Sequence, residues 1–420
     1  METTPLAIEH DFRAILAPES IRAATVADAV CGVETRLILE PANEQELAAA
    51  LRLANDANLA VIPRGGGTKH DWGNPPQRAD IILSTARLDK IIEHAWADLT
   101  VTVEAGCTIQ KLQSALAQHG QRLAFDPLWL ETATIGGALS TNDSGSLRLR
   151  FGALRDLIIG VTIALPDGTL ASSGGKVVKN VAGYDLPKLV TGALGTLGVI
   201  TRATFRLHPL PHNTKTLSAA SVNLESMQRL LLAVQDSQLA HTSLQARITQ
   251  DSEPVVDILF EGTEEGIAAQ ESQFRNLARP AEVSEAPRDV WNASQELWNS
   301  ADSAALAKIT ALPAAIAHTV ERLQRINGSQ ETRWKLAIQA TGIGWLSLEG
   351  APAHLHAALS ALRVELERDG ASLTLLHRPA SMQPLDTWGQ PGDALPLMRA
   401  VKHQFDSHNT LNPGRFVGGI

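Results

Sequence analysis

A run of three glycines in the segment VIPRGGGTKHD, residues 61–71, constrains what this chain can fold into more than any other feature. The apolar residues 58–62 predict a short buried strand that Pro63 ends. Because glycine has no Cβ atom, Gly65 to Gly67 can adopt positive φ and let a ligand approach the backbone. Successive N–H groups in such a turn suit an anion, above all phosphate, and Arg64 adds a positive charge beside them. A flexible surface loop is the alternative for a single glycine run, but similar segments follow downstream.

Composition limits the class of protein. The chain has 420 residues, which favours two domains, and its net charge of -9 argues against broad binding of nucleic acid or anionic membranes. Cys31 and Cys107 are too few for a disulfide framework or for the four thiolates of an iron–sulfur cluster. We see no signal-peptide pattern and no apolar run as long as a membrane span, so we expect a cytoplasmic protein.

The first half of the chain interleaves strands and helices, which indicates an α+β layer. Residues 1–34 are weakly patterned and predict a helix or an arm over the core. Asn43 and Glu46 form a predicted capping box at the start of a helix. The predicted strands cover residues 36–40, 80–84, 99–103, 157–165 and 199–207, and the predicted helices cover 43–59, 108–119 and 186–190.

Two more glycine-rich clusters follow the first. The segment 133–145, ATIGGALSTNDSG, is predicted as a second turn with hydroxyls from Thr134 and Ser140 and a hydrogen-bonding amide from Asn142. The third cluster spans residues 174–185 and contains Tyr184, the only tyrosine. Together the clusters favour a bound phosphate-containing ligand over unrelated surface loops.

These motifs, in this order, carry a family resemblance. RGGGT, VTVEAG, ATIGGALSTNDSG and GGKVVKNVAGYDLPKLVTGALGTLGVI together resemble the FAD-binding domain of the vanillyl-alcohol-oxidase superfamily, also called the PCMH type. The last block is most similar to the FAD-binding subunits of bacterial glycolate oxidases. The resemblance covers residues 35–210 and returns at residues 405–415, FDSHNTLNPGR.

Residues 211–380 change character, because strands and helices alternate there without glycine-rich turns. This region resembles the antiparallel sheet-plus-helices cap domain of the same superfamily. The predicted organisation is an N-terminal helix or arm over 1–34, an FAD-binding domain over 35–210, a cap over 211–380 and a segment over 381–420 that returns to the FAD-binding domain.

The resemblance implies which residues surround the cofactor. In several relatives a histidine directly after the glycine turn is bonded to the flavin, and Thr68 occupies that position here, so we expect noncovalent FAD. His70 is interpreted as a surface or structural histidine. No G-x-G-x-x-G motif supports a nicotinamide site, and no metal is predicted. The predicted cofactor-binding residues are Arg64, Gly65, Gly66, Gly67, Thr68, Lys69, Pro127, Thr134, Gly136, Gly137, Ser140, Asn142, Ser144, Gly145, Val199 and Ile200.

A catalytic base is not identified. The larger flavin subunit of the family and its D-lactate dehydrogenase relatives share an HxGDGNxH segment that this sequence lacks. His354 and His356 are interpreted as solvent-facing helix residues. His377 and Arg378 are candidates for a substrate carboxylate, although an interdomain contact is favoured. Tyr184 is interpreted either as a flavin contact or as packing under a helix cap.

The expected function is therefore an FAD-binding subunit of a glycolate oxidase complex that oxidises a small 2-hydroxy acid. The resemblance implies two partners, a larger FAD-containing subunit and an iron–sulfur subunit, and peripheral association with the inner face of the cytoplasmic membrane through them stays open. The alternatives are a self-sufficient FAD-dependent 2-hydroxy-acid dehydrogenase and a flavin-fold scaffold without FAD. The intact glycine clusters argue against the scaffold.

Overall fold

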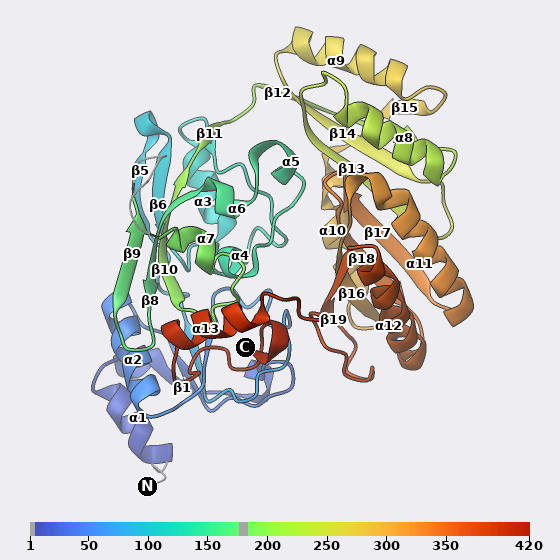
Figure 1. The fold of residues 1–420 in the computed structure, drawn as a ribbon. Coiled ribbons are helices and arrows are strands. Elements are labelled where there is room, and N and C mark those ends of the chain that lie inside the picture. The colour runs from blue at the N-terminus through green and yellow to red at the C-terminus, as the bar shows by residue number, and fades with distance from the viewer. Residues whose placement is uncertain (1–4, 176–183) are drawn as a thin grey trace. The chain divides into compact units, whose positions relative to one another are not determined.

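The computed structural model describes residues 5–175 and 184–420 (Figure 1). The chain divides into two compact units: the first contains residues 1–144, 152–210 and 390–420, and the second contains 145–151 and 211–389. Most of the third glycine cluster, residues 176–183, lies outside the described residues. None of the described helices is both long enough and apolar enough to cross a lipid bilayer.

A four-stranded sheet in the order β1-β2-β4-β3 carries the strand that precedes the glycine turn. β2, β4 and β3 are parallel, and β1 pairs antiparallel with β2. Helix α2 connects β2 to β3, which lie on either side of β4 and run parallel to it. The bounds are β1 Ile21–Ala23, β2 Leu37–Leu39, α2 Glu44–Asp56, β3 Val61–Arg64 and β4 Ile81–Ser84.

Helix α2 begins as its sequence predicts. The Asn43 side chain accepts a hydrogen bond from the Glu46 backbone N–H at 2.9 Å. The Glu46 carboxylate accepts one from the Ala42 N–H at 2.8 Å, one residue earlier than in the standard capping box. Leu47 and Leu51 on the apolar face of the helix are buried against the four-stranded sheet. This packing holds the sheet whose strand β3 leads into the glycine turn.

A five-stranded antiparallel sheet in the order β5-β6-β10-β8-β9 completes the framework of the first unit. The bounds of its strands are β5 Ile91–Ala95, β6 Thr100–Glu104, β8 Ile158–Ala164, β9 Leu170–Gly174 and β10 Val199–Arg206. The other elements of this unit are α1 Pro5–Arg13, α3 Ile109–Ala117, β7 Gln121–Arg122, α4 Ile135–Thr141, α6 Leu154–Leu157, α7 Leu186–Val190, β11 His208–Pro209 and α13 Leu395–Phe405.

The second glycine-rich segment is a helix and not a turn, which corrects the prediction. Thr134 caps helix α4, and its side chain accepts a hydrogen bond from the Gly137 N–H at 3.3 Å. A Cβ atom on Gly136 would lie 2.8 Å from the Cβ of Ala105, which follows β6. The glycine therefore allows α4 to pack closely against the end of β6.

The C-terminal segment lies along the free edge of β3. The Val61 N–H donates to the Thr410 carbonyl at 2.7 Å, and the Asn412 N–H donates to the Val61 carbonyl at 2.9 Å. These bonds cover the exposed edge of the strand. They also position residues 412–415 beside the glycine turn that follows β3.

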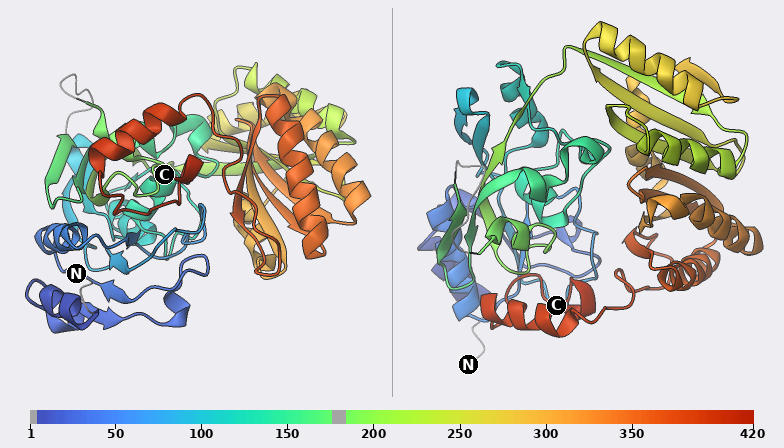
Figure 2. Two further views of the ribbon diagram at one scale, coloured as in Figure 1. Left: turned by 60° about the horizontal axis from the view of Figure 1, so that its bottom comes forward. Right: turned by 45° about the horizontal axis from the view of Figure 1, so that its top comes forward.

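The second unit is an eight-stranded antiparallel sheet with helices α8, α9, α11 and α12 on one face (Figures 1 and 2). The apolar residues of the helices and of the facing side of the sheet form one core. The bounds are α5 Arg148–Phe151, β12 Asn213–Ala220, α8 Leu224–Gln235, β13 His241–Thr249, β14 Val255–Gly262, α9 Glu264–Leu277, β15 Glu282–Glu285, α10 Ala293–Glu296, β16 Ala304–Thr310, α11 Ile316–Gln330, β17 Arg333–Gln339, β18 Ile343–Glu349, α12 Pro352–Arg368 and β19 Ser372–His377.

Candidate functional site

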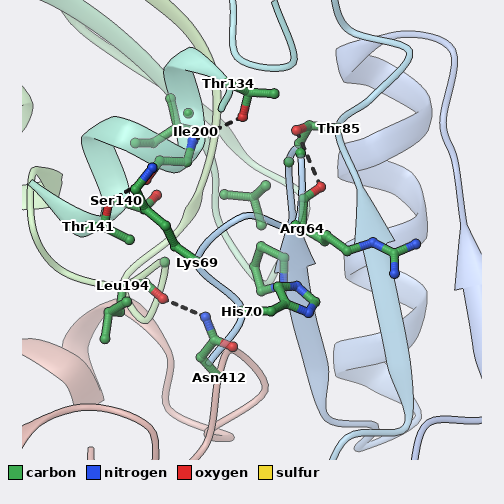
Figure 3. Close-up of a pocket in the computed structure, with 18 of the residues that line it drawn as sticks. Arg64, Lys69, His70, Thr85, Thr134, Ser140, Thr141, Leu194, Ile200 and Asn412 are labelled. Carbon is green, nitrogen blue, oxygen red and sulfur yellow. Dashed lines mark hydrogen bonds between the residues drawn. The ribbon is translucent and has the colours of Figure 1, made fainter. Parts of the chain in front are cut away.

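A cavity lies in the first unit where the glycine turn, helix α4, residues 194–200 and the C-terminal segment meet (Figure 3). The predicted cofactor residues that line it are Arg64, Gly65, Gly66, Gly67, Thr68, Lys69, Thr134, Gly136, Gly137, Ser140, Val199 and Ile200. Pro127, Asn142, Ser144 and Gly145 are not among the lining residues.

The glycine turn, whose residues line this cavity, carries a row of unused backbone donors. Among the described residues, no group accepts a hydrogen bond from the N–H groups of Gly65, Gly66, Gly67 or Thr68. Backbone N–H groups are nearly always paired in folded proteins with protein groups, water or ligands. Four consecutive unpaired donors on a cavity wall fit an anionic ligand such as a phosphate.

The reason for the glycines differs from the prediction at two of the three positions. Only Gly67 has a positive φ, +73°. A Cβ atom on Gly65 would lie 2.1 Å from Thr134 Oγ1, and one on Gly66 would lie 1.8 Å from the Thr132 carbonyl oxygen. Gly65 and Gly66 are thus required because the turn packs directly against the residues that precede α4.

The Arg64 guanidinium points away from the cavity, which corrects the expectation that its charge lies beside the phosphate site. Figure 3 shows its side chain extending away from the other lining residues. Its Nη1 contacts Asp28 Oδ1 at 3.0 Å. Asp28 also binds Arg22, and this hydrogen bond, followed by those from Thr25 and Arg64, holds the pKa of the Asp28 carboxyl well below its usual range. The ion pair between Arg64 and Asp28 connects the N-terminal region to the end of β3.

Lys69 is buried, and its charge is paired with a carboxylate. Its Nζ lies 3.2 Å from Asp143 Oδ2 and over the rings of Trp129 and Trp72, at 5.2 and 5.7 Å from their centroids. Asp143 Oδ2 also accepts the Leu128 N–H at 3.0 Å. Lys69 therefore ties the glycine turn to the residues after α4. A phosphate in the cavity would be held mainly by backbone donors rather than by this charge.

Helix α4 supplies the hydroxyl groups of the opposite wall. Thr134 Oγ1 is engaged in capping the helix, and Thr141 Oγ1 donates to the Gly137 carbonyl at 2.9 Å. The Ser140 side chain forms no hydrogen bond with the described residues. Ser140 is thus the hydroxyl of this wall that is available to a ligand.

The C-terminal segment closes the cavity with Asn412 and Arg415, which sequence reasoning did not select as site residues. The Asn412 side chain donates to the Leu194 carbonyl (Figure 3). The Arg415 guanidinium donates to the backbone carbonyls of His70 and Trp72. Burial lowers the pKa of Arg415 from its usual value. The signal that could have identified both residues was the quoted C-terminal motif, in which they occupy the Asn-Pro-Gly-Arg run.

His70, interpreted above as a surface or structural histidine, also lines the cavity and is half-buried. Its Nε2 is buried and has no hydrogen-bond partner among the described residues. Burial, followed by the charges of Arg415 and Arg64, lowers the pKa of His70 to about 4, although Asp71 and Asp28 oppose the shift. The imidazole is therefore neutral near pH 7.

We expect this histidine to make stability depend on pH. The His70 pKa is about 4 in the folded chain and 6.5 when unperturbed. The unfolded state therefore binds more protons between these values, and the free energy of unfolding should fall as pH drops from 6.5 toward 4. Urea unfolding at several pH values measures this. His70→Asn should flatten the profile in this window, and an unchanged slope in the variant would contradict the assignment.

The other candidates from the sequence are not among the residues that line this cavity. His354 and His356 are partly exposed on helix α12. His377 Nε2 lies 2.9 Å from the Ala301 carbonyl oxygen, and Arg378 donates to the Met382 carbonyl at 2.8 Å. The Tyr184 side chain is 95% exposed, so it does not pack under the helix cap. Further lining residues that were not among the predicted cofactor-binding residues are Pro63, Thr85, Thr141, Leu194, Gly195 and Gly198.

Comparisons with known proteins agree with this geometry. Residues 35–174 match the family model described as FAD binding domain. The chain is 36% identical over 203 residues to a D-lactate dehydrogenase of Archaeoglobus fulgidus, which covers 48% of this chain and 45% of that protein. It is 33% identical over 189 residues to the glycolate oxidase subunit GlcD of Bacillus subtilis, which covers 45% of this chain and 40% of that one.

Two further matches extend over most of the chain. A D-2-hydroxyglutarate dehydrogenase of Xanthomonas citri pv. viticola is 26% identical over 413 residues, covering 89% of this chain and 88% of that one. The crystal structure of p-cresol methylhydroxylase superimposes with a TM-score of 0.81 at 14% identity, covering 99% of this chain and 97% of that one.

The matched region spans less than half the length of the first two relatives. The p-cresol methylhydroxylase structure shares both the α+β fold and its two-part arrangement, which confirms the predicted fold class. The unpaired donors of the glycine turn lie inside the matched domain and fit the diphosphate of the predicted cofactor. Residues 35–174 therefore match an FAD binding domain, and FAD is the cofactor of this chain.

Proposed function

We propose that this chain is the FAD-binding subunit of a 2-hydroxy-acid dehydrogenase that oxidises glycolate to glyoxylate and passes the electrons on through partner subunits. The observation that carries the proposal is the row of unpaired N–H groups over Gly65 to Thr68 inside an FAD-binding domain. The relatives named above support the substrate class, because lactate, glycolate and 2-hydroxyglutarate are all 2-hydroxy acids.

The proposed roles of the lining residues follow from their chemistry. The N–H groups of the glycine turn would bind the diphosphate of FAD, with the Ser140 hydroxyl facing them from α4. The apolar Val199 and Ile200, at the start of β10, would contact a flat apolar surface of the cofactor. FAD supplies the ring that accepts electrons from the substrate, and the chain supplies binding, orientation and exclusion of water.

Partner subunits are part of the proposal because of what the sequence lacks. The HxGDGNxH segment of the larger flavin subunits is not present in the 420 residues. A hydroxy-acid dehydrogenase needs a base and cationic groups near the flavin. The proposed complex therefore contains a larger FAD subunit that oxidises the hydroxy acid and an iron–sulfur subunit that carries electrons onward.

A second candidate is a self-sufficient FAD-dependent 2-hydroxy-acid dehydrogenase. The alignment with the Xanthomonas enzyme favours it, because that alignment covers 88% of an enzyme named for its own activity. The two candidates differ in whether the isolated chain turns over substrate.

We expect FAD to be bound noncovalently, because Thr68 has no ring nitrogen that could bond to the flavin. Precipitation of the purified protein with acid should leave the flavin in the supernatant, where its visible absorption can be quantified. Flavin that remains in the washed pellet would contradict this prediction.

We expect turnover of 2-hydroxy acids to depend on the partners. The chain alone and the co-purified complex would be assayed with glycolate, D-lactate and D-2-hydroxyglutarate and an artificial electron acceptor, at equal bound FAD. The complex should be at least about tenfold faster than the chain alone, equivalent to about 1.4 kcal/mol in activation free energy. Equal rates would establish the self-sufficient dehydrogenase instead, and no flavin in either sample would overturn both candidates.

A further inference from the structure

His70 is a lining residue of the FAD cavity to which neither the family match nor the predicted site assigns a role. Figure 3 places its ring among the lining side chains, whereas the Arg64 guanidinium extends away from them. The buried Nε2 atom has no hydrogen-bond partner among the described residues. A buried polar atom without a hydrogen-bond partner costs stability. Its position on a cavity wall therefore indicates that a bound ligand supplies the missing hydrogen bond.

The backbone around His70 is fixed on the side away from the cavity. Arg415 donates to the carbonyls of His70 and Trp72, and Cys31 Sγ lies 3.8 Å from the His70 carbonyl oxygen. The His70 N–H donates to the Gly67 carbonyl at 3.4 Å. These contacts fix the backbone that carries the imidazole, directly after the row of free N–H groups. The fixed backbone limits the positions that the ring can reach.

The ring is also neutral, and the reason lies in its surroundings. Desolvation and the guanidiniums of Arg415 and Arg64 disfavour a charged imidazole, and Asp71 and Asp28 do not compensate. A neutral imidazole donates one hydrogen bond and accepts one. This capacity suits the edge of a heteroaromatic ring, which offers both donors and acceptors, better than it suits a diphosphate.

We propose that His70 is a flavin-binding residue whose imidazole hydrogen-bonds the edge of the isoalloxazine ring of FAD. The proposal rests on the cavity being the FAD site, as in the proposed function. In this proposal the diphosphate is bound by the N–H groups of Gly65 to Thr68, which are free and adjacent. A hydrogen bond to the ring edge tunes the electronic properties of a flavin, so His70 would influence both FAD affinity and the bound flavin's spectrum.

The test compares FAD with ADP, which has the diphosphate but no flavin ring. Dissociation constants for both would be measured on apoprotein of the wild type, His70→Phe and His70→Asn. His70→Phe should bind FAD about five- to tenfold more weakly and ADP within about twofold of the wild type. His70→Asn, which keeps a donor and an acceptor, should recover most of the FAD affinity. The visible absorption maxima and midpoint potential of bound FAD should shift in the Phe variant.

His408→Phe is the matched control, because His408 is exposed and does not line the cavity. It should leave both dissociation constants and the spectrum unchanged. If His70→Phe fails to fold, His70→Leu, which also removes the donor and the acceptor, takes its place, and an unaltered flavin spectrum and potential in that variant overturn the proposal. Equal weakening of FAD and ADP also overturns it, because the contact would then not be to the ring. A wild-type chain that binds no FAD would overturn the proposed function itself.

Discussion

Gly66→Val should abolish FAD binding by this chain. The Cβ atom of the new side chain would lie 1.8 Å from the Thr132 carbonyl oxygen and 2.9 Å from its carbonyl carbon. Both are backbone atoms in the segment that precedes helix α4, so no side-chain rotation can relieve the overlap. The turn must move away from α4, and its row of N–H groups then no longer faces the cavity.

The expected size of the effect is large. Four backbone donors would lose their common orientation, and we expect the FAD dissociation constant to rise by at least about a hundredfold, or about 2.7 kcal/mol. Isothermal titration of the apoprotein with FAD measures this, and circular dichroism with thermal melting reports the fold. We expect a lower melting temperature, because the overlap also disturbs packing between the two walls.

Gly392→Val is the matched control for this variant. A Cβ atom at Gly392 meets no atom within 4 Å, and the residue is exposed with no positive φ. The control should keep the FAD affinity and melting temperature of the wild type. A Gly66→Val protein that retains FAD as tightly as this control would show that the turn does not contribute to the cofactor site.

Elements with strong local signals could be predicted from the sequence. Asn43 caps helix α2 as predicted, and Thr108 caps helix α3 at the start of the predicted helix 108–119, because a cap is a contact between residues three apart. The residues Pro166, Asp167 and Gly168 are typical of a tight turn, and they join the paired strands β8 and β9. These features depend on neighbours in the chain, which a single sequence displays.

Other elements were not predicted because their pattern is weak. Strand β13 is buried on both faces and carries Ser243 and Gln245 in its interior, so it lacks the alternation of a half-buried strand. Helix α9 buries only Ile267 and Phe274. The segment around Gly136 and Gly137 was predicted as a glycine-rich turn, but it is a helix that packs closely against Ala105, although glycine disfavours helices.

At the candidate site, the sequence indicated the glycine turn but not how its charges are used. Arg64 pairs with Asp28, which is 36 residues away in the chain, and Lys69 pairs with Asp143. Arg415 reaches the carbonyls of His70 and Trp72 from the far end of the chain. Contacts between residues so far apart in the chain leave no local pattern in a single sequence. The charges near the turn were therefore predicted to contact the ligand, whereas they form pairs within the protein.

Lys402→Ala should strongly destabilise the first unit. The Lys402 Nζ is buried and lies 2.6 Å from Asp406 Oδ2, and it donates to the carbonyls of Thr196 and Leu411 at 2.9 Å each. Burial lowers the pKa of Lys402, although Asp406 opposes the shift. Removal of the lysine would leave the Asp406 carboxylate, which is 3% exposed, without its cation. Breaking such a buried pair costs about 3–5 kcal/mol.

The consequence should extend to the cofactor, because Lys402 joins both sides of one cavity wall. Thr196 lies between the lining residues Leu194 and Gly198, and Leu411 precedes the lining residue Asn412. We therefore expect weaker FAD binding as well as a lower free energy of unfolding, measured by urea unfolding of the apoprotein and by FAD titration. His403→Ala, an exposed site on the same helix, is the control. If both variants unfold at the same urea concentration, the buried pair does not hold the C-terminal segment against the FAD-binding domain.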